Sequence, residues 1–242
     1  SPAPRAAWGS WSMGRGKRYI AQLAMFDRDK LYGLGEAIDI IQKMSRAKFD
    51  ETIDIAFKLG VDPRQSDQTI RGALPLPHGT GKTNRVIVVA DGPAAEAARE
   101  AGADEVGFEE LMDKVKGGWL DFDVMIATPE AMQKVRTLGR VLGPRGLMPN
   151  PKTGTVTDAP GDAVKEAKAG RVEYRADKTG IVHVVVGMAS FDRQALIENT
   201  EVVISALNRA RPASAKGTYM ESCTISSTMS PGVRVDSRAF AE

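Results

Sequence analysis

Cysteine and histidine are scarce in this chain of 242 residues, and long hydrophobic runs are absent from it. The single cysteine, Cys223, excludes an internal disulfide framework and a cysteine-based zinc site. The two histidines, His78 and His183, are too few for most metal centres, and no Ser-His-Asp or Cys-His arrangement is indicated. No apolar run approaches ~18 residues, which excludes a transmembrane helix. We therefore expect no metal, no other cofactor and no membrane partner.

Acidic residues are missing from the first 26 positions, where four basic residues and two tryptophans lie among serine, alanine and glycine. This composition is typical of a transit-peptide remnant or of a basic arm that contacts RNA. The chain begins at Ser1, and Met13 is a plausible original start. Residues 1–12 are therefore interpreted as a leader or an extension.

Charge is distributed mildly unevenly along the chain. The net charge from acidic and basic side chains is +3 for residues 1–72, −3 for residues 73–164 and +2 for residues 165–242. Ordinary solvated surface explains this asymmetry about as well as nucleic-acid binding does. The hydrophobic content of 42% and the charged content of 26% are typical of a globular protein.

The stretch at 138–157 contains four glycines, three prolines and three basic residues, and it contains no acid. Periodic structure cannot run through it, because proline removes backbone donors and glycine loosens the backbone. It also contains apolar residues such as Leu142, Leu147 and Val156. These predict an ordered loop that is anchored at several points.

Strands and helices alternate in the middle of the chain. Continuous apolar runs predict buried strands at 85–90 and 124–127, a short strand lies around Val106, and helices are expected at 93–101, 109–116 and 129–140. This order is typical of βαβ units with helices on both faces of a parallel sheet. We therefore predict an inserted Rossmann-like α/β domain at residues 73–161.

The two chain ends show a different pattern. Before the insert we expect a helix at 34–45 and a strand at 48–60; after it, a short helix at 163–169, two strands from 171 to 186, a helix at 191–209, a strand at 217–227 and an exposed turn and tail at 229–236. Neither end has enough strands to cover its apolar faces, so residues 13–72 and 162–242 are predicted to join as one discontinuous α+β open-sheet sandwich. The crossings at Gly72 and at Pro160 and Gly161 would form a hinge that permits rigid-body rotation.

A nucleotide-binding enzyme is the alternative function that the residues leave open. Gly81, Lys82 and Thr83 resemble the end of a phosphate-binding loop. The pattern requires glycine where this chain has Leu76, and the segment precedes a strand instead of opening a helix. A tight turn entering a strand is the simpler interpretation.

The segment 142–152, which reads LGPRGLMPNPK, resembles together with residues 154–156 the signature of the ribosomal protein L-one family, the universal first protein of the large ribosomal subunit. The similarity is closer to the bacterial and organellar members. Further matching segments, in chain order, are 47–52, 60–64, 66–68, 71–72, 76–81, 168–171, 177–183, 215–217 and 227–229.

This resemblance implies a protein without enzymatic activity and without homo-oligomerisation. It implies binding to a helical region of large-subunit rRNA that forms the mobile stalk, beside the exit site where deacylated tRNA is released, and bacterial members also repress translation of their own mRNA. The acid-free leader slightly favours a mitochondrial or other organellar ribosome over a bacterial one. An RNA-binding regulator that acts away from ribosomes is a third alternative.

The resemblance also implies which residues lie at or near RNA. They are Glu36, Lys48, Phe49, Glu51, Thr52, Arg171, Asp177, Lys178, His183, Lys216, Thr228 and Met229. Their basic members can pair with phosphates, and Thr228 can exchange hydrogen bonds with a 2′-OH. Phe49 would present its ring to RNA or, equally, pack in the core, and the carboxylates would accept from ribose hydroxyls or orient basic residues. Ser230 departs from the family, which usually has glycine there; a positive φ or a close RNA approach at that site would make serine costly.

Overall fold

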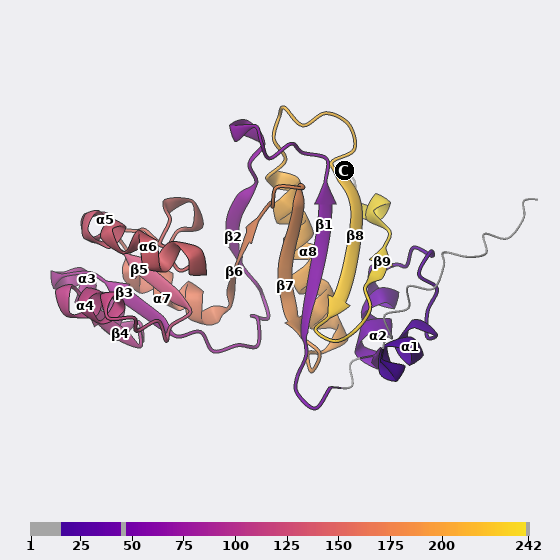
Figure 1. The fold of residues 1–242 in the computed structure, drawn as a ribbon, viewed down its shortest axis with the longest axis horizontal. Helices are drawn as coiled ribbons and strands as arrows, with labels where there is room; N and C mark the ends of the chain where they lie inside the picture. Colours follow the sequence, from indigo (N-terminus) through magenta and orange to yellow (C-terminus); the bar gives the residue numbers. More distant parts are fainter. Residues whose placement is uncertain (1–15, 45–46, 241–242) are drawn as a thin grey trace, which may run out of the picture.

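The computed structural model describes residues 16–44 and 47–240, and the predicted leader at 1–12 lies outside these ranges. The described residues form sheets of four, three and two strands, with helices packed against the two larger sheets (Figure 1). The predicted mixed α/β architecture is confirmed.

The four-stranded sheet is built from both ends of the chain. Its strands, in spatial order, are β7 (Ile181–Met188), β1 (Thr52–Leu59), β8 (Met220–Ser227) and β9 (Val233–Val235), all antiparallel. Alternate side chains of β1 are buried, because helices cover only one face of this sheet. The helices are α2 (Leu34–Met44) and α8 (Arg193–Arg209), which pack with Ile55 and Phe57 in one hydrophobic core (Figure 1). The opposite face stays open.

Two elements near the chain ends differ from the prediction. The prediction of an exposed turn and tail at 229–236 is wrong, because β9 pairs with β8 there and buries Val233 and Val235. Three residues are too few to show the alternation that marks a strand. A short helix that was not predicted, α1 (Lys17–Leu23), precedes α2.

The three-stranded sheet is parallel, in the order β4 (Glu105–Gly107), β3 (Val86–Val89) and β5 (Val124–Ala127). Helices α3 (Gly92–Glu100) and α7 (Pro160–Ala169) cover one face, and α4 (Glu109–Lys116) and α5 (Pro129–Val135) cover the other. Burial on both faces explains why β3 and β5 appear in the sequence as unbroken apolar runs. The helix predicted at 129–140 is interrupted, since a 3-10 turn follows α5 before α6 (Gly139–Leu142) begins.

A two-stranded ribbon, β2 (Arg71–Pro75) with β6 (Arg171–Arg175), lies between the two larger sheets (Figure 1). Its apolar side chains, among them Leu74, Val172 and Tyr174, belong to the core of the four-stranded sheet. Helix α7, which spans the predicted boundary at 161/162, packs instead on the three-stranded sheet through Val164 and Ala167. The division into domains at 72/73 and 161/162 stays a prediction.

The stretch at 138–157 is ordered and anchored, as predicted. It contains α6 and two 3-10 turns that end at Gly146 and Gly154, both in the left-handed region with φ of 70° and 67°. Leu142 is fully buried under the three-stranded sheet, and Val156 bridges to Ala127 at the end of β5. The loop therefore caps the carboxyl end of that sheet.

Candidate nucleic-acid interface

Six of the predicted RNA-binding residues gather at the end of the four-stranded sheet where β1 begins and β8 finishes. We call this end, made of residues 47–52 and 227–230, the Thr228 end. Its centre is the Glu51 carboxylate, which is 1% exposed. One oxygen, Oε1, accepts from the Ala47 N–H at 3.0 Å, and Oε2 accepts from Ser227 Oγ at 2.7 Å and from the Met229 N–H at 3.1 Å. Glu51 thus joins the two loops from inside.

The hydrogen bonds at Glu51 determine its charge. Burial alone would raise the pKa of this carboxyl, but the bonds from Ser227, Met229 and Ala47 outweigh burial and lower the pKa below its usual value. Glu51 is therefore ionised at neutral pH and fully engaged with protein donors. Glu51 therefore orders the two loops, and its expected role toward RNA or toward basic residues stays a prediction.

Large side chains project outward from the loops that Glu51 joins. Phe49 and Met229 are each 55% exposed, and Lys48 is exposed beside Phe49. The alternative that Phe49 packs in the core is wrong. Asp50 fastens the same loop by accepting from the Ser190 N–H at 3.0 Å and from Ser190 Oγ at 2.5 Å. The backbone that carries these exposed side chains is therefore fixed by the hydrogen bonds of Glu51 and Asp50.

The Thr228 hydroxyl is already partly used by the protein. It accepts from the Thr52 N–H at 3.1 Å and lies 3.4 Å from the Thr52 carbonyl oxygen, to which it can donate. A hydroxyl has two acceptor lone pairs, so one remains open at this exposed site. Ser230 fills the place where the family usually has glycine, and its Oγ accepts from the Ser227 N–H at 2.9 Å. This bond stabilises the turn with serine present.

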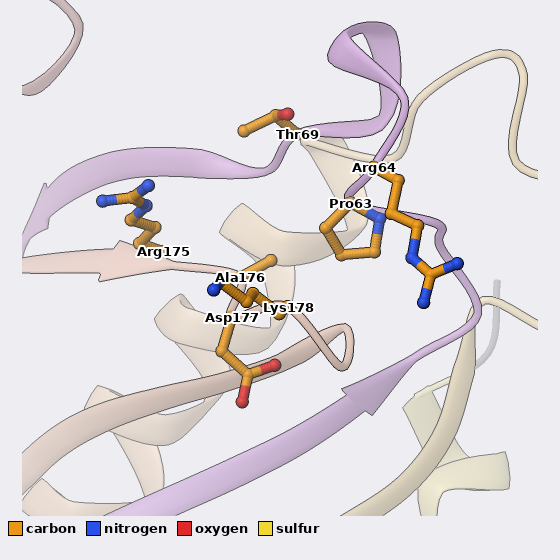
Figure 2. A pocket seen from close by; sticks show the side chains of 7 residues that line it. All are labelled: Pro63, Arg64, Thr69, Arg175, Ala176, Asp177 and Lys178. Atoms are coloured by element: carbon orange, nitrogen blue, oxygen red, sulfur yellow. The ribbon is translucent and has the colours of Figure 1, made fainter.

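Three further predicted residues lie at the opposite end of the sheet, roughly 23 Å away, because the eight residues of β1 span seven steps of about 3.3 Å. They are Asp177 and Lys178, in the turn before β7 (Figure 2), and Lys216, in the loop before β8. The Asp177 carboxylate accepts from Thr179 Oγ1 and from the Thr179 and Ile181 N–H groups at 2.7–2.9 Å. The Thr179 hydroxyl and the Ile181 amide lower the pKa of Asp177, which therefore stays ionised within the turn.

The open face of the sheet extends between these two ends of the strands. His183 is exposed there, opposite Ala56 in the β1–β7 register. The prediction missed Asp54, which lies on the same face opposite Val185. Its Oδ1 is buried without a hydrogen-bond partner, and burial raises its pKa although His183 and Lys82 counteract this. An acidic residue within an alternating strand gives no signal of such an environment.

Arg171 is not brought to the Thr228 end. The Arg171 side chain is only 18% exposed; its Nη1 donates to Glu166 Oε2 at 2.7 Å and its guanidinium packs over Gly154. That position joins β6 to the 138–157 loop and leaves little of the cation for phosphate. Glu36 is exposed in the first turn of α2.

The predicted hinge residues lie inside packed elements. Gly72 is in β2 opposite Tyr174, whose hydroxyl would be 2.6 Å from a Cβ at this position. Pro160 and Gly161 form the first turn of α7, where a Cβ on Gly161 would lie 3.1 Å from the Ala97 carbonyl oxygen. The role of these residues in a motion stays a prediction.

The described residues do not favour nucleotide or metal chemistry. Gly81 packs against Met188 and Phe191, and the segment it belongs to leads into β3. At the carboxyl end of β3, the Asp91 carboxylate accepts from the Gly92 N–H and so occupies the N-terminus of α3 that a phosphate would need. No group of three or more potential metal ligands is found in the described ranges, and no helix there could cross a membrane.

Comparison with known proteins gives the family. A model described as the Ribosomal protein L1p/L10e family matches residues 41–231. A protein described as large ribosomal subunit protein uL1, from the bacterium Methylobacillus flagellatus, is 59% identical over 225 residues, covering 93% of this chain and 98% of that protein. A bacterial relative gives no support to the organellar preference. Since the family model spans most of the chain, and this relative is similar over nearly its full length, the chain belongs to the Ribosomal protein L1p/L10e family.

Proposed function

We propose that this chain is a structural protein of the large ribosomal subunit, without enzymatic activity, and that it binds large-subunit rRNA through the Thr228 end. Its family and the description of its bacterial relative support the ribosomal role. Following the resemblance, the RNA is the helical region of the mobile stalk beside the exit site, where the protein assists release of deacylated tRNA. In a bacterial cell, which the relative favours, the same surface would also bind the protein's own mRNA.

The observation that carries this proposal is the chemistry exposed at the Thr228 end. A flat ring at Phe49 suits a base or ribose, a cation at Lys48 suits a phosphate, and the free lone pair of Thr228 suits a 2′-OH. Phe49 and Met229 are both exposed on the two loops that Glu51 joins, so apolar contact area is available to RNA beside these polar groups. Because Glu51 holds the loops in place, these groups need little ordering when RNA binds.

We also propose that the chain divides into an RNA-binding unit of both chain ends and an inserted α/β unit. Packing suggests that the ribbon belongs to the first unit and α7 to the second, so that the crossings lie near Gly79 and Gly170. These glycines have φ of 67° and 100°, and a Cβ on Gly170 would lie 2.5 Å from the Gly79 Cα. The two crossings therefore run side by side.

A hydroxyl substitution at Thr228 tests the proposed interface. We expect Thr228→Val to weaken binding of a stalk rRNA transcript by roughly 1–3 kcal/mol, because an RNA hydroxyl loses its acceptor, while Thr228→Ser keeps near-native affinity. The valine variant also loses the bond from the Thr52 N–H, so the urea midpoint of each free protein is measured beside its affinity. Equal affinity of the valine variant and the native protein would remove Thr228 from the interface.

A further inference from the structure

A buried polar side chain on α8, Asn199, forms hydrogen bonds to two other parts of the chain. Asn199 is 0% exposed. Its Nδ2 donates to the Val186 carbonyl in β7 at 2.8 Å and to the Gly79 carbonyl at 3.2 Å, while its Oδ1 accepts from the His78 N–H at 3.1 Å. A buried amide is costly unless it is hydrogen-bonded, so these contacts tie α8 firmly to residues 78 and 79. Those residues begin the first crossing from the ribbon to the three-stranded sheet (Figure 1).

The preceding residue of α8, Glu198, binds the same segment from the surface. Its Oε2 lies 2.6 Å from His78 Nε2, and both side chains are partly exposed. The hydrogen bond from His78 lowers the pKa of Glu198 below its usual 4.5, so this carboxylate is ionised at neutral pH. We call Glu198 and Asn199 the α8 clamp. Two consecutive residues of one helix thus hold the start of the first crossing.

The far end of the first crossing is fixed to a different part of the molecule. Asn84 Nδ2 donates to the carbonyl oxygen of Ala167 in α7, at 3.1 Å. Lys82 and Thr83, which separate the two fixed ends, are exposed and belong to no helix or strand. A change in the relative orientation of the two ends can therefore be absorbed at residues 82 and 83.

The second crossing is a single residue, because α7 ends at Ala169 and β6 begins at Arg171. That residue is Gly170, whose carbonyl accepts from the Leu76 N–H at 3.4 Å. The clamped segment of the first crossing therefore lies beside the second one. Arg171 also donates back across the junction to Glu166 of α7, at 2.7 Å, and this bond restrains α7 from the other side.

On the basis of the proposed division into two units, we propose that the α8 clamp is a positioning device for the α/β unit. By fixing His78 and Gly79 to the RNA-binding unit, it sets the resting orientation of the α/β unit and limits its rotation. Asn199 makes the larger contribution, because buried hydrogen bonds cannot be exchanged for bonds to water, whereas an exposed pair such as Glu198 with His78 is screened by solvent. Neither residue of the clamp was implied by the family resemblance.

The test measures the distribution of distances between the two units in the full chain. Labels are attached at Ser205→Cys on α8 and at Glu110→Cys on α4, both exposed positions, while the native Cys223 is buried and stays unlabelled in the folded protein. Each hydrogen bond lost from the clamp should raise the population with a released crossing roughly fivefold. Asn199→Ala removes two bonds to the crossing and should broaden the distribution more than Glu198→Ala does.

Matched variants on the same helix provide the controls. Asn208→Ala removes an amide that donates to the Phe240 carbonyl, and Glu201→Ala removes an exposed carboxylate. Neither contacts a crossing, so both should keep the native distribution of distances. Broadening in the controls as large as in the clamp variants would overturn the proposal.

Stability separates positioning from a purely structural role. Glu198→Ala changes an exposed position, so its urea midpoint should stay close to the native value while its distance distribution broadens. A native distribution in both clamp variants would overturn the proposal, and a lowered midpoint of Asn199→Ala would then assign Asn199 to stability alone. The distances are measured without RNA. Failure of the native chain to bind a stalk rRNA transcript would therefore overturn the proposed RNA binding, while the distances would still decide on the clamp.

Discussion

The structure predicts the effect of the substitution Glu51→Gln in most detail. Glutamine has the size of glutamate, but one of its two oxygens is replaced by an NH₂ group. The native carboxylate accepts at both oxygens, from Ala47 on one side and from Ser227 and Met229 on the other. Whichever way the amide turns, its NH₂ group faces a backbone N–H that cannot accept a hydrogen bond. A partly buried N–H group, that of Ala47 or of Met229, is therefore left without an acceptor.

The cost follows from these contacts. Losing a hydrogen bond to a charged group and leaving its donor buried destabilises by roughly 1.5–3 kcal/mol, and the two remaining bonds weaken because the acceptor is neutral. Relief from burying a charge offsets part of this. We expect a net loss of roughly 2–3 kcal/mol in the free energy of unfolding at pH 7, measured by urea denaturation. Glu36→Gln, at an exposed position, is the control and should change stability by less than about 0.5 kcal/mol.

The pH dependence provides the refuting result. The pKa of Glu51 is lower in the folded chain than its usual value of 4.5, so its ionised form stabilises the fold above that value. This stabilisation is lost as the pH falls through the folded pKa, and the native protein then approaches the glutamine variant. A stability difference that is absent at pH 7, or that stays constant on acidification, would refute the assignment of Glu51 as the charged acceptor that joins the two loops.

Two shorter predictions concern the same sheet. Asp54→Asn should stabilise the protein at pH 7, because burial raises the pKa of Asp54 above its usual 3.8 and ionisation of such a carboxyl disfavours the fold. The gain in the free energy of unfolding should vanish on acidification below about 3.8, and a gain independent of pH would contradict this explanation. Cys223 is 1% exposed, and burial raises its pKa to about 12. A thiol reagent at pH 8 should therefore label Cys223 only at urea concentrations that unfold the protein. Rapid labelling of the native protein would instead show that β8 opens locally.

The sequence predicts the elements of the fold well where burial leaves a strong pattern. Strands β3 and β5 appear as apolar runs because both of their faces are covered, and α4 has the predicted bounds, ending before Gly117. It predicts poorly what depends on distant pairing. The β2–β6 ribbon joins segments about one hundred residues apart, and β9 shows its strand character only beside β8.

The site residues could be named from the resemblance but not placed by it. Lys48, Phe49, Thr228 and Met229 do share one exposed edge. Arg171 looked equivalent to the other cations, yet the structure pairs it with Glu166, because burial and partners are properties of the fold and not of the residue type.

Acidic residues within the surface proposed to bind RNA have a physical explanation in this fold. Glu51 and Asp177 lie at opposite ends of the sheet, and each accepts three hydrogen bonds from loop donors. For both, those bonds lower the pKa, so the charge is retained at neutral pH and directed into the loop instead of toward RNA. Each carboxylate thereby orders the backbone beside a basic residue, which is Lys48 at one end of the sheet and Lys178 at the other. Because the loops are already ordered by these carboxylates, less conformational entropy would be lost when RNA binds as proposed, and this is the contribution that an acid can make to such a surface.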